Sequence, residues 1–268
     1  MLNKYPYVHI LALDFSKAFD SISHTSLSSK LVASNLPDNV YNWFIHYLAD
    51  RQHKTYYANE LSPSADITAS VVQGSALGPV AFIINAADLH PAHEGNKMAK
   101  YADDTYLLIP SINSNTIELE LDHVTSWAAD NNLKLNVLKS QELLVRNKNT
   151  STNSLPPPNS KIERVSFLCV LGITFNQYLE ISDHVTNVLQ KSNQCLYALK
   201  ILKSKGLAGR SLNTVCKSTL LSSLAYASPS WWGFASAEDR ARLESVIKKA
   251  MRWGVRGMIP YLLYNIFV

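Results

Sequence analysis

Three carboxylates are the side chains of this 268-residue sequence best suited to chemistry. Asp103 and Asp104 are adjacent between two apolar stretches, and Asp14 ends another. Adjacent carboxylates repel each other, and a divalent cation relieves that repulsion. Mg²⁺ takes oxygen ligands and keeps positions open for water and phosphate, and three carboxylates could clamp two ions about 4 Å apart. An Asp-Asp pair is also a common turn sequence, and the residue types alone leave that alternative open.

Strands have to deliver these three side chains. Residues 7–14 predict a buried strand that ends at Asp14, and residues 98–109 predict two short strands with Asp103 and Asp104 in the turn between them. The remaining apolar patterns predict helices at 26–34, 39–48, 80–89, 115–131, 183–204, 211–226 and 238–253, and strands at 54–58, 67–72, 141–146 and 164–175.

These elements predict an α+β fold in two parts. Strands and helices alternate up to a polar, proline-rich loop at 147–160 and a further strand region, and the pattern is helical from Asp183 onward. We therefore expect one domain over residues 1–182 and a helical domain over residues 183–268.

Charge separates the same two parts. Residues 1–182 carry 13 Lys and Arg against 17 Asp and Glu, a net charge of −4, whereas residues 183–268 carry 12 against 4, a net charge of +8. A basic second part favours a negatively charged partner. Solvated basic helix faces explain the same numbers, so charge alone leaves both interpretations open.

Composition argues against several other classes of protein. No stretch approaches the roughly 20 apolar residues that span a bilayer, so we expect no membrane partner. The three cysteines lie far apart without a Cys-x-x-Cys pair, which argues against a disulfide scaffold or structural zinc site and fits a reducing compartment.

Ordered sequence blocks carry a resemblance to a known family. They are DFSKAFD at 14–20, QGSALGP at 73–79 and YADD at 101–104, followed by Trp127 with NLKLN at 132–136, FLCVLGITF at 167–175 and YASPSWWG at 226–233. In this order they resemble motifs A to E and the thumb region of a reverse transcriptase, closest to the LINE-type, non-LTR retrotransposon enzymes. The resemblance spans roughly residues 8–255.

The resemblance implies a right-hand polymerase fold. The palm, an antiparallel sheet packed on helices, would be followed by a helical thumb. The implied activity is RNA-directed DNA polymerisation, in which dNTPs are added to the 3′-hydroxyl of a DNA primer on an RNA template. The implied cofactors are two Mg²⁺ ions, for which Mn²⁺ can substitute.

The family's catalytic roles transfer to matching positions. Asp14 and Asp103 match the principal metal ligands, Asp104 matches the second carboxylate of the turn, and the backbone carbonyl of Phe15 is expected to contact a metal. Lys139 matches the lysine proposed as general acid for the pyrophosphate, although a surface lysine is the ordinary alternative.

Four positions match the nucleotide and template contacts. Phe19 occupies the position of the aromatic gate that excludes a 2′-hydroxyl, with a core aromatic as the alternative. Gln73 and Gly74 match the segment that lines the nascent base pair, where the absent Cβ of Gly74 would let the backbone approach closely. A helix-entry turn explains these two residues equally well. Tyr101 completes the set.

Basic residues after position 182 are expected to contact phosphates from one side of the thumb: Lys191, Lys200, Lys203, Lys205, Arg210 and Lys217. Trp231 and Trp232 suggest base stacking, but their aromatic and proline neighbours favour packing in the thumb core.

The resemblance begins almost at motif A, so we expect the chain to lack most of the family's fingers segment and to be a fragment or a decayed copy. A catalytically inactive nucleic-acid-binding remnant and a reverse transcriptase of the group II intron type are the alternative functions.

Overall fold

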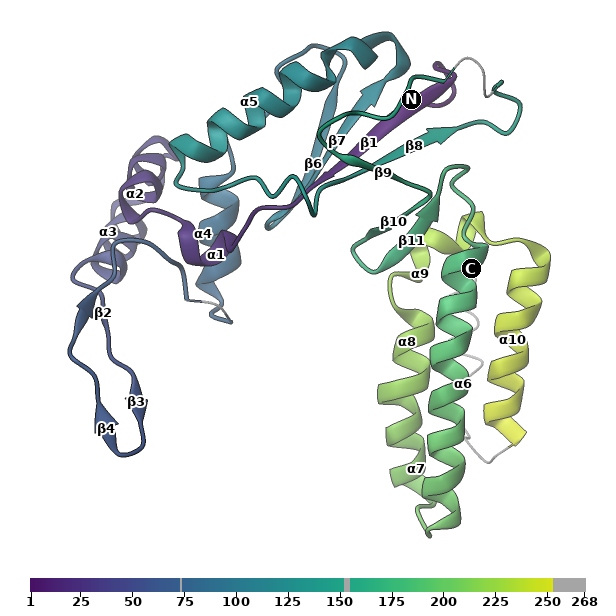
Figure 1. The fold of residues 1–268 in the computed structure, drawn as a ribbon. Helices are drawn as coiled ribbons and strands as arrows, with labels where there is room; N and C mark the ends of the chain where they lie inside the picture. Colours follow the sequence, from purple (N-terminus) through teal and green to yellow (C-terminus); the bar gives the residue numbers. More distant parts are fainter. Residues whose placement is uncertain (73, 152–154, 253–268) are drawn as a thin grey trace. The chain divides into compact units, whose positions relative to one another are not determined.

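A computed structural model of the chain describes residues 1–72, 74–151 and 155–252. The chain packs as two compact units, Met1–Val165 and Ser166–Val268. The first combines a sheet with helices, and the second is mainly helical (Figure 1). The predicted α+β class is confirmed.

A five-stranded sheet forms the centre of the first unit, in the order β6-β7-β1-β8-β9 (Figure 1). Its strands are β1 (Tyr7–Leu13), β6 (Lys97–Tyr101), β7 (Asp104–Pro110), β8 (Gln141–Arg146) and β9 (Glu163–Val165). Neighbouring strands are antiparallel except β8 and β9, which are parallel. The first strand in the sequence therefore lies in the middle of the sheet.

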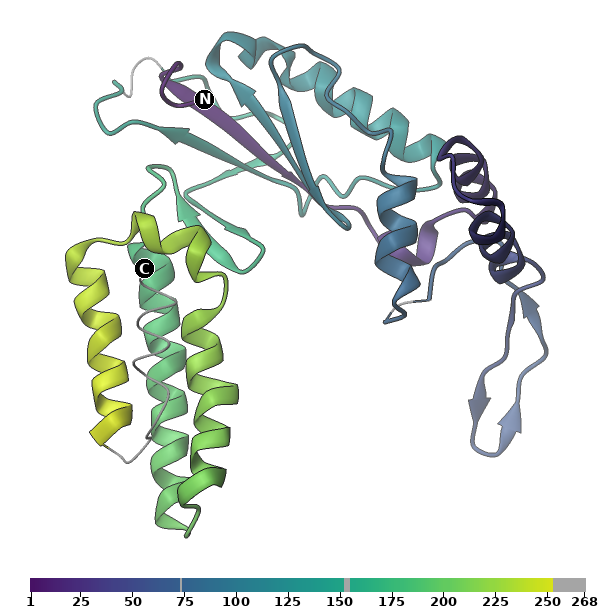
Figure 2. The ribbon, with the colours of Figure 1, turned by 180° about the vertical axis from the view of Figure 1, so that it is seen from behind.

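Helices cover one face of this sheet. They are α1 (Ala18–Ser21), α2 (His24–Ala33), α3 (Asp38–Leu48), α4 (Leu77–Asn85) and α5 (Ile117–Asp130), the last preceded by the 3₁₀ turn η1 (Ser111–Thr116). Because side chains alternate along a strand, only every second residue of β1 and β7 enters the core, as Leu11 and Leu107 do. Seen from behind, the other face of the sheet carries no helix of the described part of this unit (Figure 2).

Two small ribbons replace the strand pair predicted at 54–58 and 67–72. Strand β2 (Gln52–His53) pairs with β5 (Ala65–Asp66), and β3 (Tyr56–Tyr57) pairs with β4 (Glu60–Leu61). The strand predicted at 67–72 is wrong. This segment returns the chain to the core, where Val71 is 1% exposed and its N–H donates to the Phe19 carbonyl at 2.8 Å.

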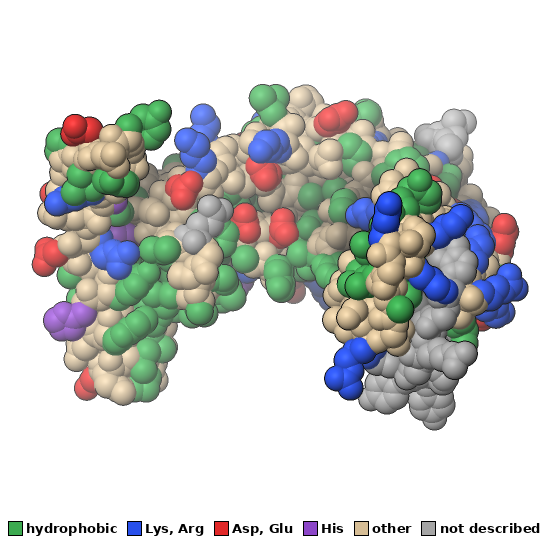
Figure 3. Space-filling model, turned by 90° about the horizontal axis from the view of Figure 1, so that it is seen from below, with side chains coloured by type: hydrophobic (Ala, Val, Ile, Leu, Met, Phe, Trp, Pro, Cys, Tyr) green, Lys and Arg blue, Asp and Glu red, His purple; other side chains and the backbone are tan. Residues whose placement is uncertain are grey.

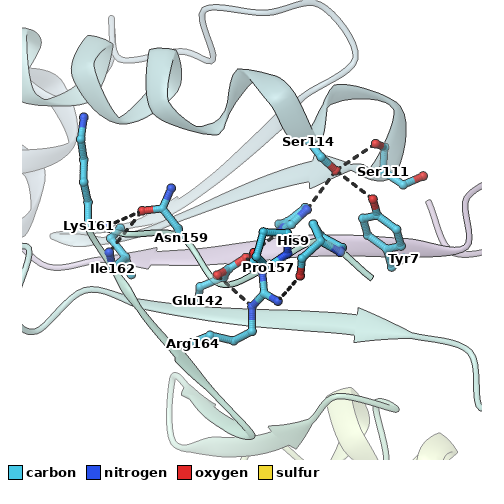
Figure 4. Close-up of polar contacts among 11 residues, drawn as sticks. Tyr7, His9, Ser111, Ser114, Glu142, Pro157, Asn159, Lys161, Ile162 and Arg164 are labelled. Atoms are coloured by element: carbon cyan, nitrogen blue, oxygen red, sulfur yellow. Dashed lines mark hydrogen bonds and ion pairs between the residues drawn. The ribbon is translucent and has the colours of Figure 1, made fainter. Parts of the chain in front are cut away.

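A buried charge cluster joins β1, β8 and β9 (Figure 4). Glu142 is fully buried and contacts His9 Nδ1 at 2.6 Å. Arg164 donates to both carboxylate oxygens of Glu142, from Nε at 3.0 Å and from Nη2 at 2.9 Å. Burial alone would raise the pKa of Glu142. The contacts with His9 and Arg164 stabilise the ionised carboxylate more strongly, so the pKa of Glu142 is lowered. The cluster fixes the start of β8 against its neighbours.

The second unit begins with a hairpin and continues as helices. Its elements are β10 (Phe167–Val170), β11 (Ile173–Asn176), α6 (Ser182–Ser204), α7 (Gly209–Cys216), the π turn η3 (Lys217–Leu221), α8 (Ser222–Ala225), α9 (Ser228–Trp231), η4 (Trp232–Phe234) and α10 (Ala237–Arg252). The single helix predicted at 211–226 is thus interrupted by the π turn.

The hairpin explains why the two units divide earlier than the expected boundary at 182. Ile173 is 6% exposed and belongs to the same core as Val185 of α6. A strand whose apolar side chain is buried against α6 must fold with the helices, so the division falls between residues 165 and 166.

Across the described residues, every helix is too short or too polar to cross a lipid bilayer.

Candidate active site

Strand β1 brings Asp14 to the centre of the sheet, next to the start of β7. Leu13 pairs with Thr105 across the two antiparallel strands, so Asp14 and Asp104 lie one residue beyond this pair. Leu13 and Thr105 are 3% and 2% exposed on the helix side. Because side chains alternate, Asp14 and Asp104 project toward the open face. The register thus brings together two carboxylates 90 positions apart.

A two-residue turn positions Asp103. Tyr101 pairs with Asp104, which leaves Ala102 and Asp103 at the tip of the β6–β7 hairpin. The residue in the left-handed region is Ala102, with φ 51, rather than either aspartate. Asp103 therefore lies in the turn, as predicted, whereas Asp104 is already the first residue of β7.

The other two carboxylates affect the ionisation of Asp104. Partial burial and the negative charges of Asp103 and Asp14 raise the pKa of Asp104. Within the described parts of the chain, no three His, Cys, Asp or Glu side chains are grouped closely enough to serve as a metal-ligand set. The donor chemistry still fits a hard divalent cation, since all three groups offer oxygens and a cation would oppose the repulsion that raises this pKa.

The two predicted aromatic positions both contact the core. Phe15 is 5% exposed, and its ring meets Trp127 edge-on at 6.0 Å between centroids. Phe19 is half-buried, with its ring centroid 5.4 Å from that of Phe82 on α4. Packing therefore fixes the position of the Phe19 ring. This agrees with the interpretation of Phe19 as a core aromatic, and it is also compatible with an aromatic gate, which needs a ring in a fixed position.

The segment before α4 contains a glycine with a conformational requirement. Gly74 has φ +83, which residues other than glycine rarely adopt, and among the described residues no atom beyond its chain neighbours lies within 4 Å of where its Cβ would be. Its neighbour Gln73 lies outside the described residues. Tyr101 is 67% exposed at the end of β6. Lys139 is exposed on the loop before β8.

The six basic residues predicted to contact phosphates are exposed, but they do not form one stripe. Nine positions separate Lys191 from Lys200, which is two and a half turns, so these lysines project from opposite sides of α6. The expectation of a single basic side is wrong for this pair. Lys and Arg side chains are spread around this unit in the space-filling view (Figure 3).

A cavity of about 860 Å³ opens beside Lys191 in the second unit. Its lining includes polar residues from α6, α8 and the hairpin: Thr174, His184, Asn187, Gln190, Lys191, Gln194, Ser222 and Ser223. His184 is 5% exposed, and its Nδ1 accepts the Thr174 N–H at 3.4 Å, while its buried Nε2 has no hydrogen-bond partner among the described residues. Burial and the charge of Lys191 lower the pKa of His184, which favours a neutral ring.

Of this lining, sequence reasoning assigned a phosphate contact only to Lys191, and the quoted blocks at 167–175 and 226–233 contribute other lining residues without an assigned role. The signal that could have found the others is the spacing of Asn187, Gln190, Lys191 and Gln194, which places four polar side chains on one face of a helix.

Two of the predicted blocks meet at this cavity. Tyr226 donates its hydroxyl to the Leu171 carbonyl at 3.0 Å, and a Cβ at Gly172 would lie 3.1 Å from the Tyr226 ring. Trp231 is 1% exposed and donates Nε1–H to the Tyr226 carbonyl at 3.0 Å. Its burial confirms core packing as the interpretation of this tryptophan.

Comparisons with known proteins agree on one family. Residues 2–197 match the sequence model described as "Reverse transcriptase (RNA-dependent DNA polymerase)". The RNA-directed DNA polymerase from mobile element jockey of Drosophila melanogaster is 30% identical over 191 residues, which cover 66% of this chain and 20% of that protein. The probable RNA-directed DNA polymerase from transposon BS of the same species is 28% identical, over 92% of this chain and 29% of that protein.

The chain thus spans between a fifth and a third of the length of these two curated relatives. A solved structure of apo telomerase from Candida tropicalis has a TM-score of 0.52 at 12% identity, over 98% of this chain and 50% of that one. This likeness concerns the fold.

Proposed function

Since the chain belongs to the reverse transcriptase family, we propose that it is the palm and thumb portion of an RNA-directed DNA polymerase of a non-LTR retrotransposon. The first unit would act as the palm and the second as the thumb. The reaction is the transfer of a nucleotide from a dNTP to the 3′-hydroxyl of a DNA primer paired with an RNA template.

One observation carries this proposal. The pairing of Leu13 with Thr105 puts Asp14 beside Asp104 on the open face of the sheet, next to the turn that holds Asp103. The raised pKa of Asp104, caused by partial burial and by the other two carboxylates, supports a shared site. Carboxylates on an open sheet face would be accessible to a nucleic-acid duplex, as polymerisation requires.

Asp14, Asp103 and Asp104 would hold two Mg²⁺ ions together with the Phe15 carbonyl. Bound there, the ions would lower the pKa of the attacking hydroxyl and stabilise the charge of the leaving pyrophosphate. The chain's own contribution is to hold the carboxylates in place, because positioning provides much of the rate of such transfers.

Further side chains would orient the nucleotide and its leaving group. Phe19, fixed against Phe82, would contact the sugar and disfavour a 2′-hydroxyl. Gln73, Gly74 and Tyr101 would lie along the nascent base pair. Lys139, exposed on the loop before β8, would donate a proton to the pyrophosphate.

We further infer that the cavity in the second unit contacts the duplex backbone. The exposed cation of Lys191, which lines this cavity, suits a phosphate oxygen. Lys200, Lys203, Lys205, Arg210 and Lys217 would add phosphate contacts without base specificity, so binding should weaken steeply with salt.

The sharpest test measures metal binding without requiring turnover. Mg²⁺ or Mn²⁺ should raise the melting temperature of the chain, and the increase should disappear in Asp103→Asn. The matched control is Asp130→Asn, which removes the same charge at the exposed C-terminal end of α5 and should leave the metal response unchanged. An equal metal response in all three proteins would refute the proposed site.

Primer extension on an RNA template tests the reaction itself. Extension should require Mg²⁺ or Mn²⁺, occur with dNTPs in preference to rNTPs, and be lost in Asp103→Asn but not in Asp130→Asn. Salt-sensitive duplex binding by a protein that shows no metal response would favour the inactive nucleic-acid-binding remnant.

A further inference from the structure

The loop before β8 interrupts the pairing between β1 and β8. Ala12 pairs with Gln141, and Phe15 pairs with Leu135 in an isolated bridge. Between these pairs the first strand has only residues 13 and 14, whereas the opposing segment has residues 136–140. Three extra residues on one side form a bulged loop, so the backbone of Asp14 has no regular ladder partner.

Ser140 and Asn136 provide the missing partners. The Asp14 N–H donates to Ser140 Oγ at 3.1 Å, and the Asp14 carbonyl accepts from the Asn136 N–H at 2.7 Å. Ser140 Oγ–H in turn donates to the Asn136 carbonyl at 2.8 Å. These three bonds form a closed hydrogen-bonded ring around the peptide groups of Asp14.

Burial shields the Ser140 hydroxyl of this ring from solvent. Ser140 is 0% exposed, so water cannot readily replace its hydroxyl as the acceptor for the Asp14 N–H. An unpaired buried N–H is unfavourable, which favours keeping Asp14 in the position that satisfies it. The bridge between Phe15 and Leu135 and the bond from the Ser16 N–H to the Lys134 carbonyl at 2.9 Å continue the attachment on the far side of the loop.

We propose that Ser140 is a positioning residue for the active site: its hydroxyl fixes the backbone of Asp14 and thereby the place of the Asp14 carboxylate relative to Asp103 and Asp104. The same contact ties the loop that carries Lys139 to the first carboxylate. This inference rests on the proposed function, because it concerns the ligand role of Asp14.

The test compares Ser140→Ala, Ser140→Cys and Ser140→Thr. Alanine removes the hydroxyl, cysteine keeps the size but replaces the hydroxyl with a weak acceptor, and threonine keeps the hydroxyl. Ser192→Ala is the matched control, because Ser192 is also 0% exposed, its Oγ has no hydrogen-bond partner in the part of the chain that the structure describes, and it lies in the second unit.

The measurement is the Mg²⁺ concentration that gives half of the rise in melting temperature, with the Mn²⁺ titration in parallel. Loss of one hydrogen bond that orients a ligand should raise this concentration about three- to tenfold in the alanine and cysteine variants. The threonine variant should remain near the unchanged protein, and so should Ser192→Ala. Amide exchange at Asp14 should become faster in Ser140→Ala.

The outcomes separate this inference from the proposed function. If Asp103→Asn abolishes the metal response but the alanine and cysteine variants bind Mg²⁺ as the unchanged protein does, the role of Ser140 is refuted and the metal site stands. If the threonine variant is as impaired as the alanine variant, the effect is one of packing, and the inference also fails. If Asp103→Asn leaves the metal response intact, both proposals fall.

Discussion

The buried Glu142 cluster allows a quantitative prediction for Arg164→Met. Methionine keeps much of the length of the arginine side chain but removes its charge and all of its donors. It leaves Glu142, which is fully buried, with His9 as its remaining side-chain partner among the described residues. The variant therefore tests how strongly this contact holds β8 and β9 in the sheet that carries Asp14.

The contacts of Arg164 set the size of the effect. Its two bonds to the Glu142 carboxylate, at 3.0 and 2.9 Å, are charge-assisted and worth roughly 1.5–3 kcal/mol each. Its bonds to the carbonyls of Pro156 and Pro157 add less, because the Arg164 side chain is 18% exposed and water can replace it there. We expect the free energy of unfolding to fall by about 3–5 kcal/mol, the range for breaking a buried ion pair from one side.

The pH dependence gives a second readout. The folded-state pKa of Glu142 lies below its ordinary value of 4.5, so the group contributes stability above pH 4.5 that is lost as the pH falls through the lowered pKa. Arg164→Met removes part of the cause of this lowering. The stability difference between the two proteins should therefore narrow as the pH falls below 4.5.

Urea unfolding followed by hydrogen exchange in peptides covering β8 reports on the first unit alone. The double variant Arg164→Met with Glu142→Gln is the decisive comparison, since it removes the uncompensated charge. It should regain at least about 1.5 kcal/mol over Arg164→Met. A loss below about 1 kcal/mol in the single variant, or a double variant no more stable than the single one, would refute this account of the cluster.

Three further predictions concern the ionisation of Asp104, the stability of the first unit and the binding of a duplex. Asp104→Asn should raise the melting temperature of the metal-free chain at pH 7 but not at pH 3. The pKa of Asp104 is raised in the folded chain, so stability is lost as Asp104 ionises with rising pH. An equal shift of the melting temperature at both pH values would contradict this. Lys100→Gln should destabilise the first unit by about 1–3 kcal/mol in urea unfolding, since Lys100 Nζ caps the end of α4 at the carbonyls of Ala86 (2.5 Å) and Leu89 (2.8 Å). Lys191→Ala should reduce the salt slope of duplex binding by about one, which titrations at several salt concentrations measure; an unchanged slope would remove this lysine from the interface.

Local sequence patterns were sufficient for the type of chemistry and for most elements. Short apolar runs predicted β1 and β8, and helical spacing predicted α5, α6 and α10, because each pattern depends on neighbours close in the sequence. The ordered blocks at 14–20, 73–79 and 101–104 indicated the family, which the comparisons confirmed. The same locality explains the failure at 67–72, where alternation is compatible with an extended segment that has no strand partner.

Tertiary structure alone decided which groups meet. The register of β1 against β7 selects Asp104 as the neighbour of Asp14, and a one-residue shift of β7 would turn Asp104 to the other face. The hydroxyl of Ser140 reaches the backbone of Asp14 across 126 positions, and no local pattern encodes such a bond. The polar lining around His184 likewise depends on helices that pack together late in the chain. Residue types and spacing thus determined which chemistry these side chains can perform. Long-range pairing and burial decided which of them lie together, because contacts between distant segments depend on the packing of the whole unit.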